Sequence, residues 1–136
     1  MSVMVLDASM ALSLAFEDEC DDESLRVFDA IAIGGALVPP LWTLEVANIL
    51  GVSIRHGRIS KEDADKFLVI LADYPIETCY KPLPPPSTFL DLARLHKLTA
   101  YDASYLRLAT TTGLPLASKD GPLNEAAKKA GVKLFT

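Results

Sequence analysis

The chain has 136 residues, of which 50% are apolar and 23% are charged. This balance excludes a disordered chain, and the length suits one domain, residues 1–136, whose core needs no disulfide or structural metal. Thirteen basic residues against eighteen acidic ones give a formal net charge of −5, which excludes a broad basic coat for nucleic acid but not a nucleic-acid enzyme with a local site.

The first half of the chain alternates short apolar runs with helical patterns. Residues 2–6 are an apolar run rich in Val, which predicts a strand buried on both faces. The elements expected after it are a helix over 8–16, a helix over 24–33, a strand over 36–38 and a helix over 41–56. In the last of these helices we expect a buried stripe of Leu44, Ala47, Leu50 and Ile54.

Six of the seven residues in 17–23 are acidic. We interpret this run as a solvated loop before a helix, because acids near a helix N-terminus favour its dipole. A metal site, or a docking patch for a basic partner, is the alternative interpretation.

The second half of the chain continues the alternation. Ser60 is a good N-cap for a helix that Pro75 ends, and this helix and the one before it are expected to form an antiparallel hairpin over 41–73. The later elements are a strand over 76–80, a helix from Ser87 to residue 95, a helix over 101–112, a strand over 114–118, a helix from Pro122 to Gly131 and a strand over 132–135. Five short strands that alternate with helices predict an α/β fold with a parallel sheet and helices on both faces.

The two cysteines, Cys20 and Cys79, lack the CxxC spacing of a zinc site. We expect two buried or inert thiols in a reducing compartment, and a single disulfide is the alternative. No Lys or Arg precedes Arg26, as a signal peptide would require, and no apolar stretch reaches the roughly 18 residues that span a membrane. The sequence therefore predicts a cytoplasmic protein without a membrane partner.

Four acids are expected at one edge of the sheet, beyond the carboxyl ends of the strands, where such folds bind ligands. Asp7 ends the first strand, and Asp120 lies two residues beyond the strand over 114–118. Glu45 and Asp102 each lie near the start of a helix, in apolar surroundings where acids are rarely buried unless paired. Taken singly, each acid is explained by a cap, a turn or an exposed first helical turn. Taken together, they predict a site.

A cluster of this kind favours a metal ion. Two carboxylates about 4 Å apart repel by roughly 4 kcal/mol at an effective dielectric constant of 20. Mg²⁺ takes oxygen ligands and relieves this repulsion, and Mn²⁺ suits the same ligands. Zinc is less favoured, because no histidine lies near these acids in the sequence.

The segments around the acids carry a resemblance to a known family. They are Val5-Leu6-Asp7-Ala8-Ser9, Leu44-Glu45-Val46-Ala47-Asn48, Tyr101-Asp102-Ala103-Ser104-Tyr105 and Ala117-Ser118-Lys119-Asp120. Their order, acid identities and approximate spacing resemble the acidic quartet of the PIN-domain nucleases. The length and the lack of extra domains resemble the VapC-type toxins of prokaryotic toxin–antitoxin pairs.

The resemblance implies a PIN-like three-layer α/β/α sandwich with a five-stranded parallel sheet. It implies a Mg²⁺-dependent endoribonuclease, with Mn²⁺ as a substitute, that cleaves RNA of the tRNA or rRNA class through a metal-activated water. The implied partners are a second copy of the chain and a VapB-like antitoxin that covers the acidic site. The implied metal-binding and catalytic acids are Asp7, Glu45, Asp102 and Asp120, with Ser9, Asn48 and Ser118 in supporting roles.

Other interpretations stay open. Basic residues at 55, 56 and 58, and Lys119, either guide an RNA backbone or are exposed charges. A phosphatase of the haloacid-dehalogenase type is less favoured, because such a site needs a second Asp where this chain has Ser9. A PIN fold that binds without cleaving is a further alternative, as is an interaction role for the hairpin over 41–73.

Overall fold

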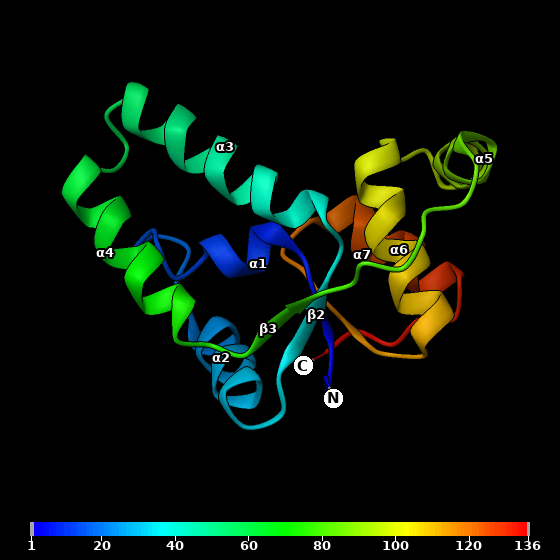
Figure 1. Cartoon of the computed structure of the whole chain (residues 1–136), viewed down its shortest axis with the longest axis horizontal. Helices are drawn as coiled ribbons and strands as arrows, with labels where there is room; N and C mark the ends of the chain where they lie inside the picture. Colours follow the sequence, from blue (N-terminus) through cyan, green and yellow to red (C-terminus); the bar gives the residue numbers. More distant parts are fainter. Residues whose placement is uncertain (1, 136) are drawn as a thin grey trace.

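The computed structural model describes residues 2–135, which form a four-stranded parallel sheet flanked by helices (Figure 1). The strand order is β3-β2-β1-β4. The strands are β1 (Val5–Leu6), β2 (Ala36–Val38), β3 (Ile76–Thr78) and β4 (Leu116–Ala117). Because all strands run in parallel, their carboxyl ends lie at one edge of the sheet, as the sequence predicts.

Seven helices are present in the described residues. They are α1 (Ala8–Leu12), α2 (Asp22–Gly34), α3 (Leu41–Arg55), α4 (Lys61–Ala72), α5 (Pro86–His96), α6 (Ala100–Thr112) and α7 (Gly121–Lys129). Helices α3 and α4 form the predicted antiparallel hairpin, which projects to the left in Figure 1, while α5 and α6 lie together on the right. Within residues 2–135, no helix combines the length and apolar character that crossing a membrane requires.

The prediction of a fifth strand over 132–135 was wrong. This segment lies beside β4, but it forms a single parallel bridge between Leu116 and Leu134. Both of its hydrogen bonds to β4 involve Leu116, whose N–H donates to the Lys133 carbonyl at 2.9 Å and whose carbonyl accepts the N–H of Phe135 at 2.8 Å. The ladder does not continue along β4, because Ser118 already belongs to the loop that leads to α7. The described sheet therefore has four strands.

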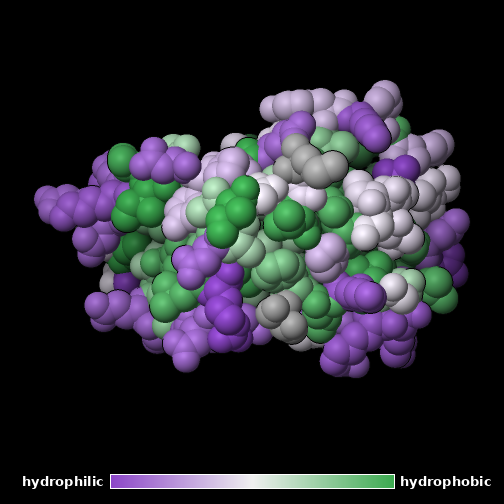
Figure 2. All heavy atoms as spheres, turned by 90° about the horizontal axis from the view of Figure 1, so that it is seen from below, coloured by the Kyte–Doolittle hydropathy of each residue, from purple (hydrophilic) through white to green (hydrophobic). Residues whose placement is uncertain are grey.

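The core surrounds β1, whose residues Val5 and Leu6 are fully buried. The predicted buried stripe of α3 was confirmed at Leu50 and in part at Ile54, which is half-buried and packs against the core. It was wrong at Leu44, which is 73% exposed, and at Ala47, which is exposed. The face that α3 buries consists of Trp42, Val46, Leu50 and Ser53. Both stripes have helical spacing, and the core selects the one that carries the large Trp42 ring. Figure 2 shows the lower side of the molecule, where hydrophobic residues gather across the middle and hydrophilic residues at both ends.

Leu123 on α7 is fully buried, whereas Leu95 on α5 is 73% exposed. We expect Leu123→Ala to lower the free energy of unfolding by about 2–5 kcal/mol, because it removes buried apolar volume and leaves a cavity. Leu95→Ala, the matched control, should change it by less than about 0.5 kcal/mol. Urea denaturation followed by circular dichroism measures both. Equal losses in the two variants would contradict the described position of α7.

Candidate functional site

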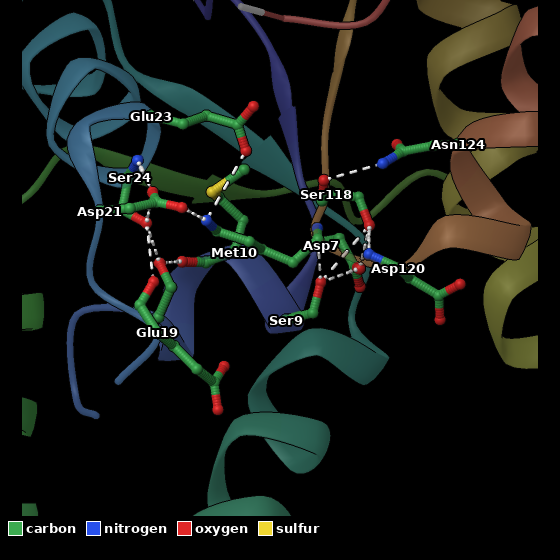
Figure 3. Close-up of polar contacts among 12 residues, drawn as sticks. Asp7, Ser9, Met10, Glu19, Asp21, Glu23, Ser24, Ser118, Asp120 and Asn124 are labelled. Atoms are coloured by element: carbon green, nitrogen blue, oxygen red, sulfur yellow. Dashed lines mark hydrogen bonds and ion pairs between the residues drawn. The ribbon is translucent and has the colours of Figure 1, made fainter. Parts of the chain in front are cut away.

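Asp7 is at the centre of the site, where β1 passes into α1. Its side chain is 5% exposed, and the hydroxyls of Ser9 and Ser118 both donate to its Oδ2 atom at 2.6 Å. Figure 3 shows the two serines reaching this carboxylate from α1 and from the loop after β4. Burial raises the pKa of Asp7, although the two hydroxyl bonds act in the opposite direction.

Asp120 is held beside Asp7 by the loop between β4 and α7. Its N–H donates to Ser118 Oγ at 2.9 Å, and the N–H of Lys119 donates to Ser9 Oγ at 3.0 Å. The carboxylate of Asp120 caps α7, since it accepts the N–H of Leu123 at 3.0 Å. The same side chain therefore begins a helix and contributes negative charge close enough to raise the pKa of Asp7.

Glu45 and Asp102 approach the site from α3 and α6. The Tyr105 hydroxyl, also on α6, donates to Glu45 Oε1 at 2.5 Å. Burial is the main cause that raises the pKa of Glu45, and the charges of Asp7 and Asp102 raise it further. Asp102 lies in the first turn of α6, where its N–H donates to the capping hydroxyl of Thr99 at 3.1 Å.

The four acids act on one another electrostatically. The pKa of Asp102 is raised first by burial and then by the charges of Asp120 and Asp7. The structure thus brings Asp7, Glu45, Asp102 and Asp120 into one region at the carboxyl edge of the sheet, with Ser9 and Ser118 bound to Asp7. Asn48 is different, because it is exposed on α3 and its side chain forms no hydrogen bond within residues 2–135.

The donor set suits a hard divalent cation. Four carboxylates and two hydroxyls offer oxygen ligands alone, which Mg²⁺ and Mn²⁺ prefer. Across residues 2–135, no three His, Cys, Asp or Glu side chains already converge closely enough to hold a metal ion. The acids instead repel one another, and Lys119, the nearest cation in sequence, directs its Nζ atom to Asp21 and Glu23. The residues fit the cation in chemistry, and its charge would relieve this repulsion.

The acidic run over 17–23 lies outside the quartet. Asp21 caps α2 by accepting the N–H of Ser24 at 2.9 Å, as expected for a loop before a helix (Figure 3). Asp18 and Glu19 pair with Arg58, whose guanidinium lies 3.8 Å from the centre of the Phe16 ring. The run is therefore largely engaged in intramolecular ion pairs. Both cysteines are free thiols, and Cys20 is exposed rather than buried.

Two residues that contact the site were not assigned a role from the sequence. Tyr105 is fully buried, and Asn124 on α7 donates its Nδ2 group to the Ser118 carbonyl at 3.0 Å. Only the role of Tyr105 could have been predicted, because a tyrosine within an apolar helical pattern needs a hydrogen-bond partner for its hydroxyl once it is buried. Asn124 carried no such signal, since a polar residue in the first turn of a helix is common.

The comparisons with known proteins support the fold. No protein-family model matches the chain, and no curated protein matches it. Among solved structures, the crystal structure of PAE2754 from Pyrobaculum aerophilum is similar, with a TM-score of 0.66 and 27% sequence identity. The match covers 93% of this chain and 87% of that chain. The likeness thus extends over nearly the whole mixed α/β fold described above.

The raised pKa of Asp7 predicts how stability depends on pH. The folded state binds this proton more tightly than the unfolded state does, so charging the carboxylate as pH rises lowers the free energy of unfolding. Asp7→Asn removes that cost. In EDTA at pH 7.5 we expect the variant to melt a few degrees above the native chain, since about 1 kcal/mol corresponds to about 3–5 °C.

This advantage should disappear below the ordinary Asp pKa of 3.8, where the native carboxyl group is neutral in both states. Differential scanning calorimetry across pH measures it. Asp29→Asn, at an exposed position of α2, is the control and should leave the melting temperature unchanged. If the native chain is more stable than Asp7→Asn at pH 7.5 in EDTA, burial of the Asp7 carboxylate does not lower the free energy of unfolding.

Tyr105→Phe tests the bond between α6 and Glu45. The change keeps the ring and removes the hydroxyl, so the free energy of unfolding should fall by about 1.5–3 kcal/mol, the scale of a hydrogen bond to a charged group. In a Glu45→Gln background the loss should be smaller, because a neutral acceptor binds the hydroxyl less strongly. A double-mutant cycle by urea denaturation measures this coupling. Additive effects would show that the two side chains do not interact.

Proposed function

We propose that the chain is a Mg²⁺-dependent endoribonuclease, with Mn²⁺ as a substitute, of the PIN-like three-layer α/β/α type. The observation that carries the proposal is the gathering of Asp7, Glu45, Asp102 and Asp120 at the carboxyl edge of a parallel sheet. Buried acids that repel one another lower the free energy of unfolding. Binding of a divalent cation would explain why the fold holds them together. The resemblance of the four motifs supports RNA as the substrate.

The four acids would hold Mg²⁺. When bound, the ion supplies positive charge to a phosphodiester and lowers the pKa of a water molecule. The chain's own residues fix the acids in place. Ser9 and Ser118 hold Oδ2 of Asp7, Tyr105 holds Oε1 of Glu45, and helix capping holds Asp120. These contacts restrain three of the four carboxylates, which limits how far they must move when an ion draws the acids together.

Two partners belong to the same proposal. The resemblance to VapC-type toxins implies a second copy of the chain and a VapB-like antitoxin, with RNA of the tRNA or rRNA class as the target. Capture of a small co-encoded protein by the purified chain, with loss of RNA cleavage on its addition, tests the antitoxin.

Cleavage of purified RNA tests the proposed activity. We expect cutting in Mg²⁺ or Mn²⁺, no cutting in EDTA, and products with 5′-phosphate and 3′-hydroxyl ends. Asp7→Asn, Glu45→Gln and Asp102→Asn should each lower the rate by about 100-fold or more, because each removes a preorganised charge. Asp29→Asn is the matched control and should cut at the native rate. Gel analysis of end-labelled RNA measures these rates.

The other functions give different results. Equal cutting by the native chain and the acid variants would show that the quartet is not the catalytic site. A native chain that binds Mg²⁺ by calorimetry but cuts no RNA in a cellular RNA pool would favour a silent binding module. Release of phosphate from a generic phosphomonoester, lost in Asp7→Asn, would favour a phosphatase.

A further inference from the structure

A groove runs along the face of α6 that carries Tyr101 and Ser104. Its wider part is lined almost entirely by apolar groups, with Leu83, Phe89, Leu90 and Tyr101 among them, and has a volume of about 570 Å³. That volume lies within the roughly 300–1,000 Å³ of small-molecule sites. Tyr101, Leu83 and Leu90 are 66%, 66% and 56% exposed, and they share one surface, so they form a contiguous apolar patch.

The groove continues into a second hollow with a different character. Phe89, Leu83 and Ser104 line both parts, so the two hollows adjoin. The second part adds Lys81 and Arg107, and the Arg107 guanidinium lies 6.0 Å from the centre of the Phe89 ring. Within the described residues, neither cation forms an ion pair, whereas Arg58, Lys61, Lys119 and Lys128 all do.

The position of the groove ties it to the acid cluster through one helix. Tyr101, Ser104 and Arg107 follow the three-residue spacing of one face of α6. Asp102 and Tyr105 follow the same spacing on the neighbouring face, which serves the acids. Arg107 lies five positions after Asp102, a rise of about 7.5 Å along the helix axis, which is comparable to the reach of one nucleotide in an extended strand.

We propose that this groove binds one nucleotide of single-stranded RNA next to the phosphate at the acid cluster, with its base against Tyr101 and Phe89 and a phosphate on Arg107 and Lys81. The choice of ligand rests on the proposed ribonuclease function. An apolar, aromatic surface accepts any unstacked base by its face, and Lys and Arg are the usual phosphate contacts. Unpaired cations beside such a surface, in a chain of net charge −5, complement a polyanion better than a protein partner.

RNA binding without cleavage tests this proposal. Fluorescein-labelled octauridylate and octaadenylate are titrated with the native chain in EDTA, and anisotropy reports the affinity. We expect Tyr101→Ala to weaken binding by about 10-fold or more, because it removes a stacking surface. Arg107→Gln and Lys81→Gln should each weaken binding of both RNAs by a similar factor and lower the salt slope by about one.

Matched controls separate the groove from general surface effects. Tyr80→Ala and Arg94→Gln change exposed residues of the same types that do not line either hollow, and both should bind as the native chain does. Nuclear magnetic resonance adds a map, since octauridylate should shift the signals of Tyr101, Phe89 and Leu90. Circular dichroism confirms that the variants fold.

Three outcomes overturn the proposal. The first is that the native chain binds no RNA, and the second is that the groove variants bind RNA as tightly as the native chain. The third is that a second copy of the chain covers the groove, which sedimentation would reveal as a dimer that Tyr101→Ala dissociates. The test is independent of the proposed activity. If RNA binding depends on the groove but the chain does not cleave RNA in Mg²⁺, only the nuclease proposal is overturned. If the chain cleaves RNA and the groove variants bind RNA as the native chain does, only the groove proposal is overturned.

Discussion

The burial of the Asp7 carboxylate is the constraint on which the rest of the site depends. A charge that is 5% exposed is costly unless other groups bind it, and here two serine hydroxyls from opposite ends of the chain do so. Those bonds also fix the loop after β4, which places Asp120. The hydrogen bonds that compensate the buried Asp7 carboxylate thus connect α1, β4 and α7. Glu45 and Asp102 lie where burial and like charge raise their pKa values.

Much of the fold and the acid positions could be predicted from the sequence. Apolar runs identified all four strands, and helix signals such as Ser60 placed α4 within a residue or two. The rule that parallel strands share a carboxyl edge then brought Asp7 and Asp120 together without any knowledge of contacts. Glu45 and Asp102 were predictable because helix starts at that edge point their first turns toward it.

What the sequence did not reveal depends on tertiary contacts. The predicted helix over 8–16 ends as α1 at Leu12, because the Ser13 hydroxyl bonds the Met10 carbonyl at 2.6 Å and the Ser24 hydroxyl at 2.8 Å. The buried face of α3 and the single bridge at Leu134 likewise depend on which neighbours the core supplies. Ion pairs such as that between Lys119 and Asp21 join residues far apart in the sequence, so no local pattern predicts them.

The placement of β1 has a consequence for the order of folding. Val5 pairs with Leu37 on one side and with Leu116 on the other, so the first of the described strands along the chain is completed by the last. Until β4 exists, β1 keeps an open hydrogen-bonding edge at the heart of the apolar core. Such distant pairing slows folding, because a long loop must close before its contacts form. A chain that lacks β4 therefore has neither a closed core nor a complete set of acids.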